Sequence, residues 1–231
     1  MILSPPLKPA GEPPGLGGPD TQKRTVVKIC GLTNFEDARA AVAAGADWLG
    51  FVVHPPSPRH IEPERAAEIL AALPGAVAVA VMVATSPALA LAIARRMRAS
   101  RVQVHRPPAG WAVDFELPVA LVVPVAADGA LTETLPDPRH LVMLDTAHAE
   151  LAGGTGETFP WEAAKRVARE RRVLLAGGLG PDNVGDALAR VHPFGIDASS
   201  SLERAPGLKD RERVRRFVEA ARAADAGRGA A

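Results

Sequence analysis

The only cysteine of this sequence, Cys30, stands at a position where a thiol could do chemistry. It follows the apolar run Val26–Ile29 and precedes Gly31, which interrupts the run before a helical pattern opens at Asn34. In α/β folds, a residue between the end of a strand and the next helix lies on the face that carries the chemistry. A lone cysteine is more commonly a small buried core residue, because reactivity requires a lowered thiol pKa. The rest of the chain has to decide between these two interpretations.

Other chemically capable residues share this position at the end of an apolar run. They comprise a carboxylate, a guanidinium, an imidazole, a second acid and two turns rich in glycine or serine: Asp145, Arg59, His105, Asp197, Gly177-Gly178 and Ser199–Ser201. Glycine and serine turns expose backbone N–H groups that suit a phosphate. If the runs are parallel strands of one barrel, these residues meet on one face, and the set predicts a site for a phosphorylated molecule.

Each of these residues also has an ordinary structural interpretation. The glycine pair could form a tight turn, and the serine run could cap the next helix. Asp145 could cap a helix or form an ion pair, Arg59 could be a solvated loop charge, and His105 could be a satisfied polar residue. The basic run Arg211–Arg216 is typical of a solvated helix face. The six histidines are scattered without the spacing of metal ligands, so we expect no metal.

The elements that must position this set alternate between strands and helices from residue 26 onward. Eight mostly apolar runs indicate strands: Val26–Cys30, Trp48–Val53, Val77–Val83, Arg101–His105, Val119–Val125, Leu141–Asp145, Val173–Ala176 and Ile196–Ser199. Runs that are apolar along their whole length are typical of a parallel sheet buried on both faces. Eight strand–helix units in this length predict a single-domain α/β fold, the (β/α)8 TIM barrel. A doubly wound open sheet is the rival, but the sequence after the first run lacks its G-x-G-x-x-G fingerprint.

Helical patterns connect most of these strands. They cover residues 34–44, 63–73, 87–97 and 211–223, and two further helices open near Trp161 and after Pro181-Asp182-Asn183. We expect Gly45 to end the first helix and Ser86 to cap the third. The segments 106–117 and 126–139 are short and broken by prolines, so the fourth and fifth crossovers are predicted to be shortened.

Composition and charge bound the remaining possibilities. The chain has 231 residues, 47% of them hydrophobic, and its formal net charge of +1 gives no reason to expect nucleic-acid or membrane binding. A single cysteine excludes an intramolecular disulfide and fits a reducing, cytoplasmic compartment. The longest apolar stretch, residues 76–84, is far shorter than the ~20 residues that a membrane-spanning helix needs. We expect a disordered Pro/Gly-rich leader over residues 1–24, the barrel over 25–222 and a frayed tail over 223–231.

From about Val27 to Phe217 the sequence resembles the phosphoribosylanthranilate isomerase family, (β/α)8 enzymes of tryptophan biosynthesis. The resemblance rests on motifs that follow one another in order: Lys28-Ile29-Cys30-Gly31-Leu32-Thr33, Ala44-Gly45-Ala46-Asp47, Gly50-Phe51-Val52, Ser57-Pro58-Arg59, Val102-Gln103-Val104-His105, Leu144-Asp145, Gly153-Gly154-Thr155-Gly156, Leu175-Ala176-Gly177-Gly178-Leu179, Pro181-Asp182-Asn183-Val184, Ile196-Asp197-Ala198-Ser199-Ser200, Glu203, Pro206-Gly207 and Lys209-Asp210. Together and in this order the motifs are highly specific, whereas any single motif would not be.

The resemblance implies a cofactor-free Amadori rearrangement, in which the aminoaldose N-(5-phosphoribosyl)anthranilate becomes the 1-deoxyribulose aminoketose. It implies that Asp145 is the general acid that opens the ribose ring, and that Cys30 is the general base that removes the C2′ proton. It also implies substrate binding by Arg59, which would face the anthranilate carboxylate, by His105, and by Asp197, which would lie near the sugar hydroxyls. The implied phosphate-binding residues are Gly156, Gly178, Ser200 and Ser201.

The chain departs from the family pattern at two places. Ser201 stands where a glycine is usual, and Arg106-Pro107 follows His105 where a glycine and an acidic residue are usual. A positive φ at Ser201 would strain the turn beside the phosphate, whereas a negative φ would let its hydroxyl donate to the phosphate. We expect a small phosphorylated aminosugar as the only partner, with no nucleic acid and no membrane, bound by a monomer or a weak homodimer.

Two alternatives to this function stay open. One is another phosphosugar barrel enzyme, such as ProFAR isomerase, which would place an aspartate where Cys30 stands, or indole-glycerol-phosphate synthase, which would need a lysine on the middle strands. The other is a non-catalytic phosphate-binding barrel. The presence of both Cys30 and Asp145 argues against it, and Ser201 is the residue that favours it.

Overall fold

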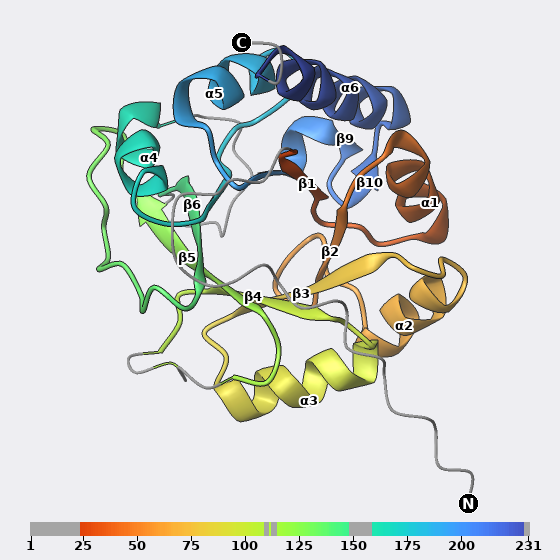
Figure 1. Ribbon diagram of the computed structural model, residues 1–231. Helices are drawn as coiled ribbons and strands as arrows, with labels where there is room; N and C mark the ends of the chain where they lie inside the picture. The colour runs from red at the N-terminus through yellow and green to blue at the C-terminus, as the bar shows by residue number, and fades with distance from the viewer. Residues whose placement is uncertain (1–23, 109–110, 112–114, 148–158, 229–231) are drawn as a thin grey trace, which may run out of the picture.

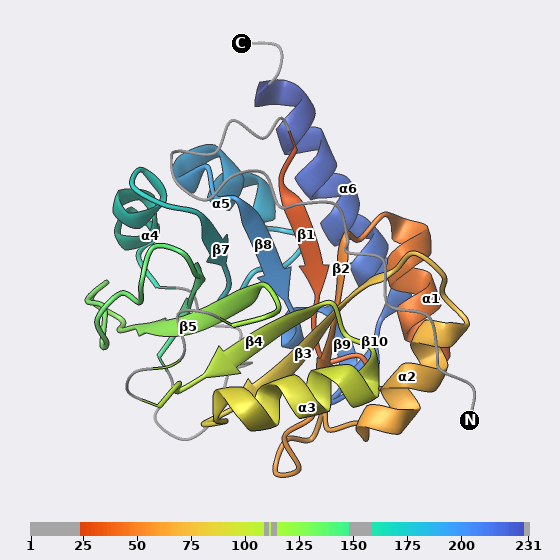
Figure 2. The same ribbon diagram turned by 60° about the horizontal axis from the view of Figure 1, so that its bottom comes forward.

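The computed structural model describes residues 24–108, 111, 115–147 and 159–228. The strands are β1 (Val26–Ile29), β2 (Trp48–Val52), β3 (Val77–Val83), β4 (Arg101–His105), β5 (Val119–Val125), β6 (Leu141–Thr146), β7 (Val173–Leu175) and β8 (Gly195–Ala198). They form a closed barrel in chain order (Figures 1 and 2). The barrel closes because β1 pairs in parallel with both β2 and β8. This closure confirms the predicted single-domain (β/α)8 barrel and excludes an open sheet.

Six helices surround the described part of the barrel on its outside, as Figure 1 shows. They are α1 (Phe35–Ala44), α2 (Pro63–Ala71), α3 (Pro87–Met97), α4 (Trp161–Ala168), α5 (Val184–Val191) and α6 (Arg211–Arg228). The first helix has its predicted ends, since the Asn34 side chain accepts from the Asp37 N–H at 2.9 Å and Gly45 closes the helix with a φ of 93°. Ser86 caps α3 in the same way, so local capping chemistry positions both helices.

The alternation of side chains along β1 sorts them into two cores. Val27 and Ile29 point outward into the large core between the strands and the helices. Val26 and Cys30 point into the barrel, where they belong to a second, smaller core. Because side chains two residues apart share a face of a strand, Lys28 also points into the barrel. A lysine two residues before Cys30 thus has its side chain inside the barrel.

The connections after β4 and β5 contain no helix in their described residues, which confirms the predicted shortening. The first of these connections contributes a buried tryptophan instead. The Trp111 indole nitrogen donates to the Thr85 carbonyl at 2.8 Å, and its ring packs against Phe115 and His140. A large aromatic side chain with its N–H satisfied can bury apolar strand surface that a helix buries elsewhere.

A short hairpin follows β8 that the sequence analysis did not predict. The 3-10 helix η1 (Ser200–Leu202) leads into β9 (Glu203–Ala205) and β10 (Leu208–Lys209), which pair antiparallel. The Thr33 hydroxyl donates to the Gly207 carbonyl at 2.6 Å, and the Lys209 N–H donates to an Asp37 carboxylate oxygen at 2.8 Å. These two bonds fasten the hairpin to the loop after β1 and to α1.

A frayed tail was predicted over residues 223–231, but α6 continues to Arg228, so residues 223–228 are helical; residues 229–231 lie outside the described residues. The carboxylate of Asp225 accepts hydrogen bonds from the Thr25 N–H at 2.9 Å and from the Thr25 hydroxyl at 2.7 Å. Asp225 is buried, so this contact ties the helix to the start of β1. Residues 1–23 of the expected leader lie outside the described residues, and the disorder of that leader stays a prediction.

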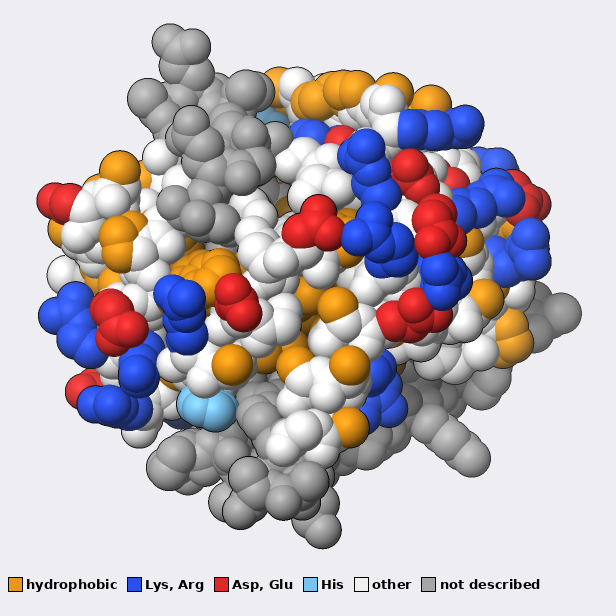
Figure 3. Space-filling view, turned by 90° about the horizontal axis from the view of Figure 1, so that it is seen from above, with side chains coloured by type: hydrophobic (Ala, Val, Ile, Leu, Met, Phe, Trp, Pro, Cys, Tyr) orange, Lys and Arg blue, Asp and Glu red, His pale blue; other side chains and the backbone are white. Residues whose placement is uncertain are grey.

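The basic run on α6 is paired with acidic side chains. Arg215 contacts Glu212 at 2.5 Å and Glu219 at 2.6 Å, and Arg216 contacts Asp182 at 2.8 Å. Figure 3, which looks down on the top of Figure 1, shows Lys and Arg side chains interspersed with Asp and Glu side chains. This face is solvated, as predicted. Among the described residues, the structure has no helix with the length and apolar character to cross a membrane.

Candidate active site

The C-terminal ends of the barrel strands open on one pocket. The predicted site residues that line it are Cys30, Arg59, His105, Asp145, Gly178, Asp197, Ser200 and Ser201. The remaining predicted residue, Gly156, lies outside the described residues. Parallel strands of a closed barrel place all their C-terminal ends on the same side, and this is why residues so far apart in the sequence converge.

An ion pair that the sequence analysis missed lies inside the barrel below Cys30. Lys28 Nζ donates to Asp197 Oδ1 at 2.8 Å, and the Lys28 side chain is completely buried. The register of β1 against β8 places these two residues opposite each other. The available signal was a lysine within an apolar strand, two residues before the thiol and hence on its face. Asp197 was expected near the sugar hydroxyls. In the structure it lines the pocket and also forms the ion pair with Lys28.

The surroundings of Cys30 shift the pKa of its thiol in opposite directions. Burial raises the pKa of Cys30 above its ordinary value, because a thiolate loses solvation in the barrel. The Lys28 ammonium opposes this rise, and the Asp197 carboxylate adds to it. Lys28 stays charged in this position: burial by itself would lower its pKa, but Asp197 and Cys30 more than offset that effect and the pKa is raised.

The carboxyl of Asp145 is poised to donate a proton near neutral pH. Burial raises its pKa to about 7, and the charge of nearby Asp197 acts in the same direction. The Thr146 N–H donates to Asp145 Oδ1 at 2.9 Å and opposes the rise. A carboxyl with this pKa is protonated in a large fraction of molecules at pH 7 and can serve as a general acid.

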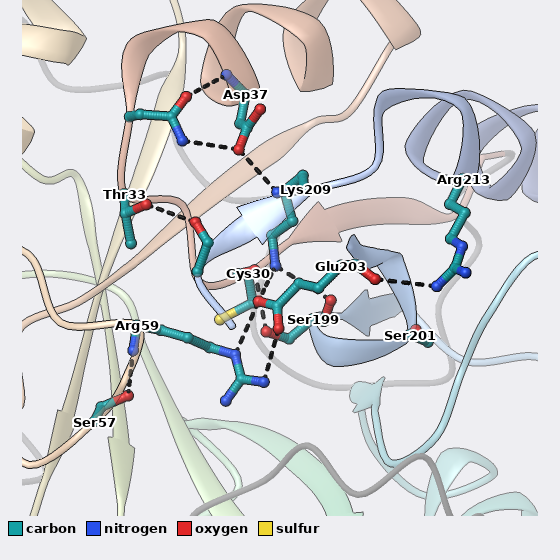
Figure 4. Close-up of polar contacts among 12 residues, drawn as sticks. Cys30, Thr33, Asp37, Ser57, Arg59, Ser199, Ser201, Glu203, Lys209 and Arg213 are labelled. Carbon is teal, nitrogen blue, oxygen red and sulfur yellow. Dashed lines mark hydrogen bonds and ion pairs between the residues drawn. The ribbon is translucent and has the colours of Figure 1, made fainter. Parts of the chain in front are cut away.

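Arg59 belongs to a cluster of three charged side chains at the rim of the pocket (Figure 4). Its Nε and Nη2 donate to the two carboxylate oxygens of Glu203 at 2.9 and 2.8 Å, and Lys209 Nζ donates to the same carboxylate at 2.8 Å. Glu203 and Lys209 come from the hairpin β9–β10, and both are buried. Burial alone would raise the pKa of Glu203, but Arg59 and Lys209 hold it below its ordinary value. Arg59 is therefore an anchored guanidinium and not a solvated loop charge.

The imidazole of His105 is neutral at physiological pH. Burial lowers its pKa to about 4, and the positive charges of Lys28 and Arg106 act in the same direction. His105 Nε2 lies 2.9 Å from Gln103 Nε2 on the same face of β4. Its place in the pocket suits a hydrogen bond to substrate without a change of charge. Among the described residues, no group of three His, Cys, Asp or Glu side chains could hold a metal ion.

Two glycines have no space for a side chain because the strand ends that carry Cys30 and Asp145 lie against them. A methyl group on Gly50 of β2 would lie 2.9 Å from Cys30 Sγ and 3.1 Å from Lys28 Cε. A methyl group on Gly177 would lie 2.7 Å from the Thr146 backbone nitrogen, and Gly177 has a φ of +80°. Neither position therefore accepts a larger residue without displacing the strand end beside it. The sequence analysis singled out Gly177 but attached no role to Gly50.

The serine that replaces the usual glycine causes no backbone strain. Ser201 lies in η1 and is absent from the positive-φ residues of the described chain. Its hydroxyl donates to the Leu179 carbonyl in the loop after β7. This hydrogen bond joins the two loops in which a phosphate site was predicted. Ser201 therefore no longer favours the alternative of a non-catalytic phosphate-binding barrel.

The comparisons with known proteins agree with this geometry. The family model for N-(5′-phosphoribosyl)anthranilate (PRA) isomerase matches residues 27–220. The N-(5′-phosphoribosyl)anthranilate isomerase of Rubrobacter xylanophilus is 44% identical over 202 residues, covering 85% of this chain and 98% of that protein. The enzyme of the same name from Trichlorobacter lovleyi is 41% identical over 201 residues, covering 86% and 98%.

Solved structures give the same result. The crystal structure of phosphoribosyl anthranilate isomerase from Thermotoga maritima has a TM-score of 0.76 and 34% identity, covering 86% of this chain and 99% of that one. A phosphoribosyl anthranilate isomerase in complex with reduced 1-(o-carboxyphenylamino)-1-deoxyribulose 5-phosphate has a TM-score of 0.71 and 32% identity, covering 86% and 99%. On the family match, on these relatives and on the barrel itself, this chain belongs to the phosphoribosylanthranilate isomerase family, and it is an isomerase of tryptophan biosynthesis.

Proposed function

We propose that this isomerase converts N-(5′-phosphoribosyl)anthranilate to 1-(2-carboxyphenylamino)-1-deoxyribulose 5-phosphate with Asp145 as general acid and Cys30 as general base. One observation carries the assignment: a carboxyl whose pKa is about 7 and the only thiol of the chain line the same pocket. The rearrangement needs one proton given to oxygen and one removed from carbon. These two side chains are suited to the two tasks.

In the first step, the Asp145 carboxyl gives its proton to the ribose ring oxygen. The bond between C1′ and the ring oxygen breaks, and the electron pair of the anthranilate nitrogen forms a C=N bond to C1′. Ring opening leaves an iminium ion and an Asp145 carboxylate. A carboxyl held protonated by burial is a stronger candidate for this step than one ionised at pH 7.

In the second step, the Cys30 thiolate removes the proton from C2′. The iminium makes this carbon-bound proton acidic, and the electron pair of the broken C–H bond moves into a C1′=C2′ enolamine. The enolamine then tautomerises to the ketone: its C2′ hydroxyl loses a proton and C1′ gains one. A net transfer of one proton from the Cys30 thiol to the Asp145 carboxylate restores both groups for the next turnover. The reaction is balanced without an oxidant, a reductant or a cofactor.

The charged rim and the two loops supply binding in this proposal. Arg59 would bind the anthranilate carboxylate through Nη1, the guanidinium nitrogen that Glu203 leaves free. The phosphate would lie between the loop at Gly178 and the N–H groups of Ser200 and Ser201. Gly156, which lies outside the described residues, stays a predicted phosphate-binding residue. The ligand named for the solved relative, a carboxyphenylamino sugar phosphate, carries both anionic groups that this arrangement would bind.

The decisive experiment is a fluorescence assay that follows the loss of phosphoribosylanthranilate with purified protein. We expect turnover by the wild type, and a fall in kcat of roughly 10²–10⁴ or more for Cys30→Ala and for Asp145→Asn, with KM little changed. Near wild-type kcat in both Cys30→Ala and Cys30→Ser would show that another group is the base. The expected state, a monomer or weak homodimer, is checked by light scattering; a solved relative is described as monomers generated from a dimeric enzyme.

A further inference from the structure

We propose that Lys28 is a positioning residue for this reaction: its buried ammonium favours ionisation of the Cys30 thiol against the effect of burial, so that the sulfur can accept a carbon-bound proton. The proposal rests on the proposed function in one respect, namely that Cys30 is the base. Lys28 does not line the pocket, so it would act through the thiol and not by touching substrate.

The geometry places the ammonium stem and the sulfur in one compartment of the barrel. Lys28 and Cys30 are two residues apart along the strand that begins at Val26, and both face inward. A methyl group built on Gly50 would contact both side chains at once, because it would lie 2.9 Å from Cys30 Sγ and 3.1 Å from Lys28 Cε. Gly50 has no side chain, so nothing from β2 separates the two groups.

The ammonium also has the capacity for a second anion. It donates to Asp197 Oδ1 at 2.8 Å, which uses one of its three N–H groups. The Lys28 side chain is fully buried, so bulk water does not screen its charge from the sulfur. A thiolate formed here would lie next to a cation that is already desolvated and oriented.

The charges around the thiol act on its ionisation in opposite directions. Asp197 on β8 disfavours a second anion, whereas Lys28 on β1 and Lys209 on β10 favour it. Four further titratable or charged side chains line the pocket: His54 and Arg59 after β2, His105 on β4 and Asp145 on β6. Burial disfavours the thiolate most of all, and Lys28 is the strongest influence in the opposite direction.

An electrostatic role and a structural role of Lys28 predict different results for the two members of the ion pair. If the pair only supports the fold, removing either partner perturbs Cys30 in the same direction. If the charges act on the sulfur, Lys28→Met disfavours the thiolate and Asp197→Asn favours it. Opposite signs from two partners of one ion pair are the signature of the proposal.

The experiment measures the rate of Cys30 alkylation by iodoacetamide from pH 6 to 10. Cys30 is the only cysteine, so the modification reports one site, and Cys30→Ala gives the background. Iodoacetamide is uncharged, so its approach does not depend on the charge of the pocket, and its rate follows the thiolate fraction. In Lys28→Met we expect the profile to move to higher pH, with about a tenfold slower reaction at neutral pH for each unit of the shift. In Asp197→Asn we expect it to move to lower pH, and Lys28→Arg should restore most of the wild-type profile.

Two outcomes would overturn the proposal: an unchanged profile in Lys28→Met, or shifts of the same sign in both single variants. If Lys28→Met does not fold because Asp197 is left unpaired, the double variant Lys28→Met/Asp197→Asn removes both buried charges. Because Lys28 is the stronger influence, the double variant should still react more slowly than Asp197→Asn alone, and an equal rate would overturn the proposal. The isomerase assay on the wild type is separate: no turnover with shifts of opposite sign would reject the proposed function and leave the charge effect standing.

Discussion

Arg59 and Glu203 hold each other through two hydrogen bonds, Nε to Oε1 at 2.9 Å and Nη2 to Oε2 at 2.8 Å, across 144 residues of sequence. Two such contacts fix the plane of the guanidinium at the pocket rim. The Nη1 nitrogen of Arg59 has no acceptor among the described residues. In the proposed function that nitrogen meets the anthranilate carboxylate, so one carboxylate anchors the guanidinium and the other is its ligand.

Arg59→Lys should raise KM although it keeps the positive charge. A lysine cannot contact Glu203 at two points and also reach a ligand, because its ammonium is a point charge on a flexible stem. A hydrogen bond between charged groups contributes about 1.5–3 kcal/mol, so we expect KM to rise about 10- to 100-fold with a smaller change in kcat. Steady-state kinetics of Arg59→Lys and Arg59→Met test this. Unimpaired kinetics in both variants would make Arg59 a bystander.

Glu203→Gln should destabilise the protein strongly. It removes the anion between two buried or half-buried cations, and breaking a buried ion pair in this way costs about 3–5 kcal/mol. The matched control is Glu212→Gln, which removes an exposed partner of Arg215 and should cost no more than about 1 kcal/mol. Urea unfolding of the two variants at pH 7 gives both values, and equal losses would contradict the burial argument.

The same variant has a defined pH dependence. The pKa of folded Glu203 lies below its ordinary value of 4.5, so its stabilisation is present above pH 4.5 and is lost as the pH falls through the folded value. The difference in unfolding free energy between wild type and Glu203→Gln should therefore shrink in acid.

Gly50→Ala should impair catalysis more than stability. The added methyl group would lie 2.9 Å from Cys30 Sγ and 3.1 Å from the Cys30 Cα, so the thiol has to move. Overpacking of this kind costs about 1–3 kcal/mol, and a displaced base lowers kcat about 10-fold or more. Gly185→Ala is the control, because open space surrounds that helical glycine, and alanine there should add about 0.5–1 kcal/mol of stability. An unchanged kcat in Gly50→Ala would mean that the thiol position is not critical.

The sequence was sufficient to predict the barrel because its signals are local. Continuous apolar runs marked the strands, and Asn34 and Gly45 marked the ends of α1. The strand ends then placed Cys30 and Asp145 on one face without knowledge of any contact. The hairpin β9–β10 was not predicted because its strands have only three and two residues, too few for a periodic pattern.

The electrostatics of the site could not be predicted in the same way. The contact of Lys28 with Asp197 joins residues 169 apart and exists only because β1 closes on β8. The raised pKa of Asp145 depends on burial and on Asp197, neither of which a sequence shows. The partner of the Ser201 hydroxyl depends likewise on how two loops meet.

Ser201→Gly should weaken phosphate binding and not strengthen it. Because φ of Ser201 is not positive, a glycine relieves no strain and adds backbone entropy in the unfolded chain, which costs about 0.5–1 kcal/mol. The hydrogen bond to Leu179 is lost as well, at about 0.5–1.5 kcal/mol. Ser201→Ala loses the bond alone, so it should fall between wild type and Ser201→Gly in both thermal stability and inorganic phosphate affinity. Tighter binding by Ser201→Gly would contradict this account.

The pH dependence of kcat/KM should be bell-shaped with a broad top. The active form has Asp145 protonated and Cys30 ionised. As pH falls below about 7, Asp145 is already protonated and the thiolate fraction decreases tenfold per unit, so the rate falls. As pH rises above the raised pKa of Cys30, the thiolate is complete and the protonated fraction of Asp145 decreases, so the rate falls again. Asp145, the general acid, has a lower pKa than Cys30, the general base, so only a minor fraction of molecules has both groups in the active state at any pH. The two pKa values read from the limbs describe the coupled pair and not each residue alone.

Asp197→Asn moves both limbs in a known direction. The charge of Asp197 raises the pKa of both Asp145 and Cys30, so removing it should shift the acid and the basic limb to lower pH. Asp197 itself lines the pocket, so its replacement is also expected to change the height of the profile, and the test uses only the positions of the limbs. The measurement is log kcat/KM from pH 5 to 10 for wild type and Asp197→Asn. An acid limb of the wild type below pH 5 would mean that Asp145 ionises as an ordinary carboxylate, and the role of general acid would have to pass to another group.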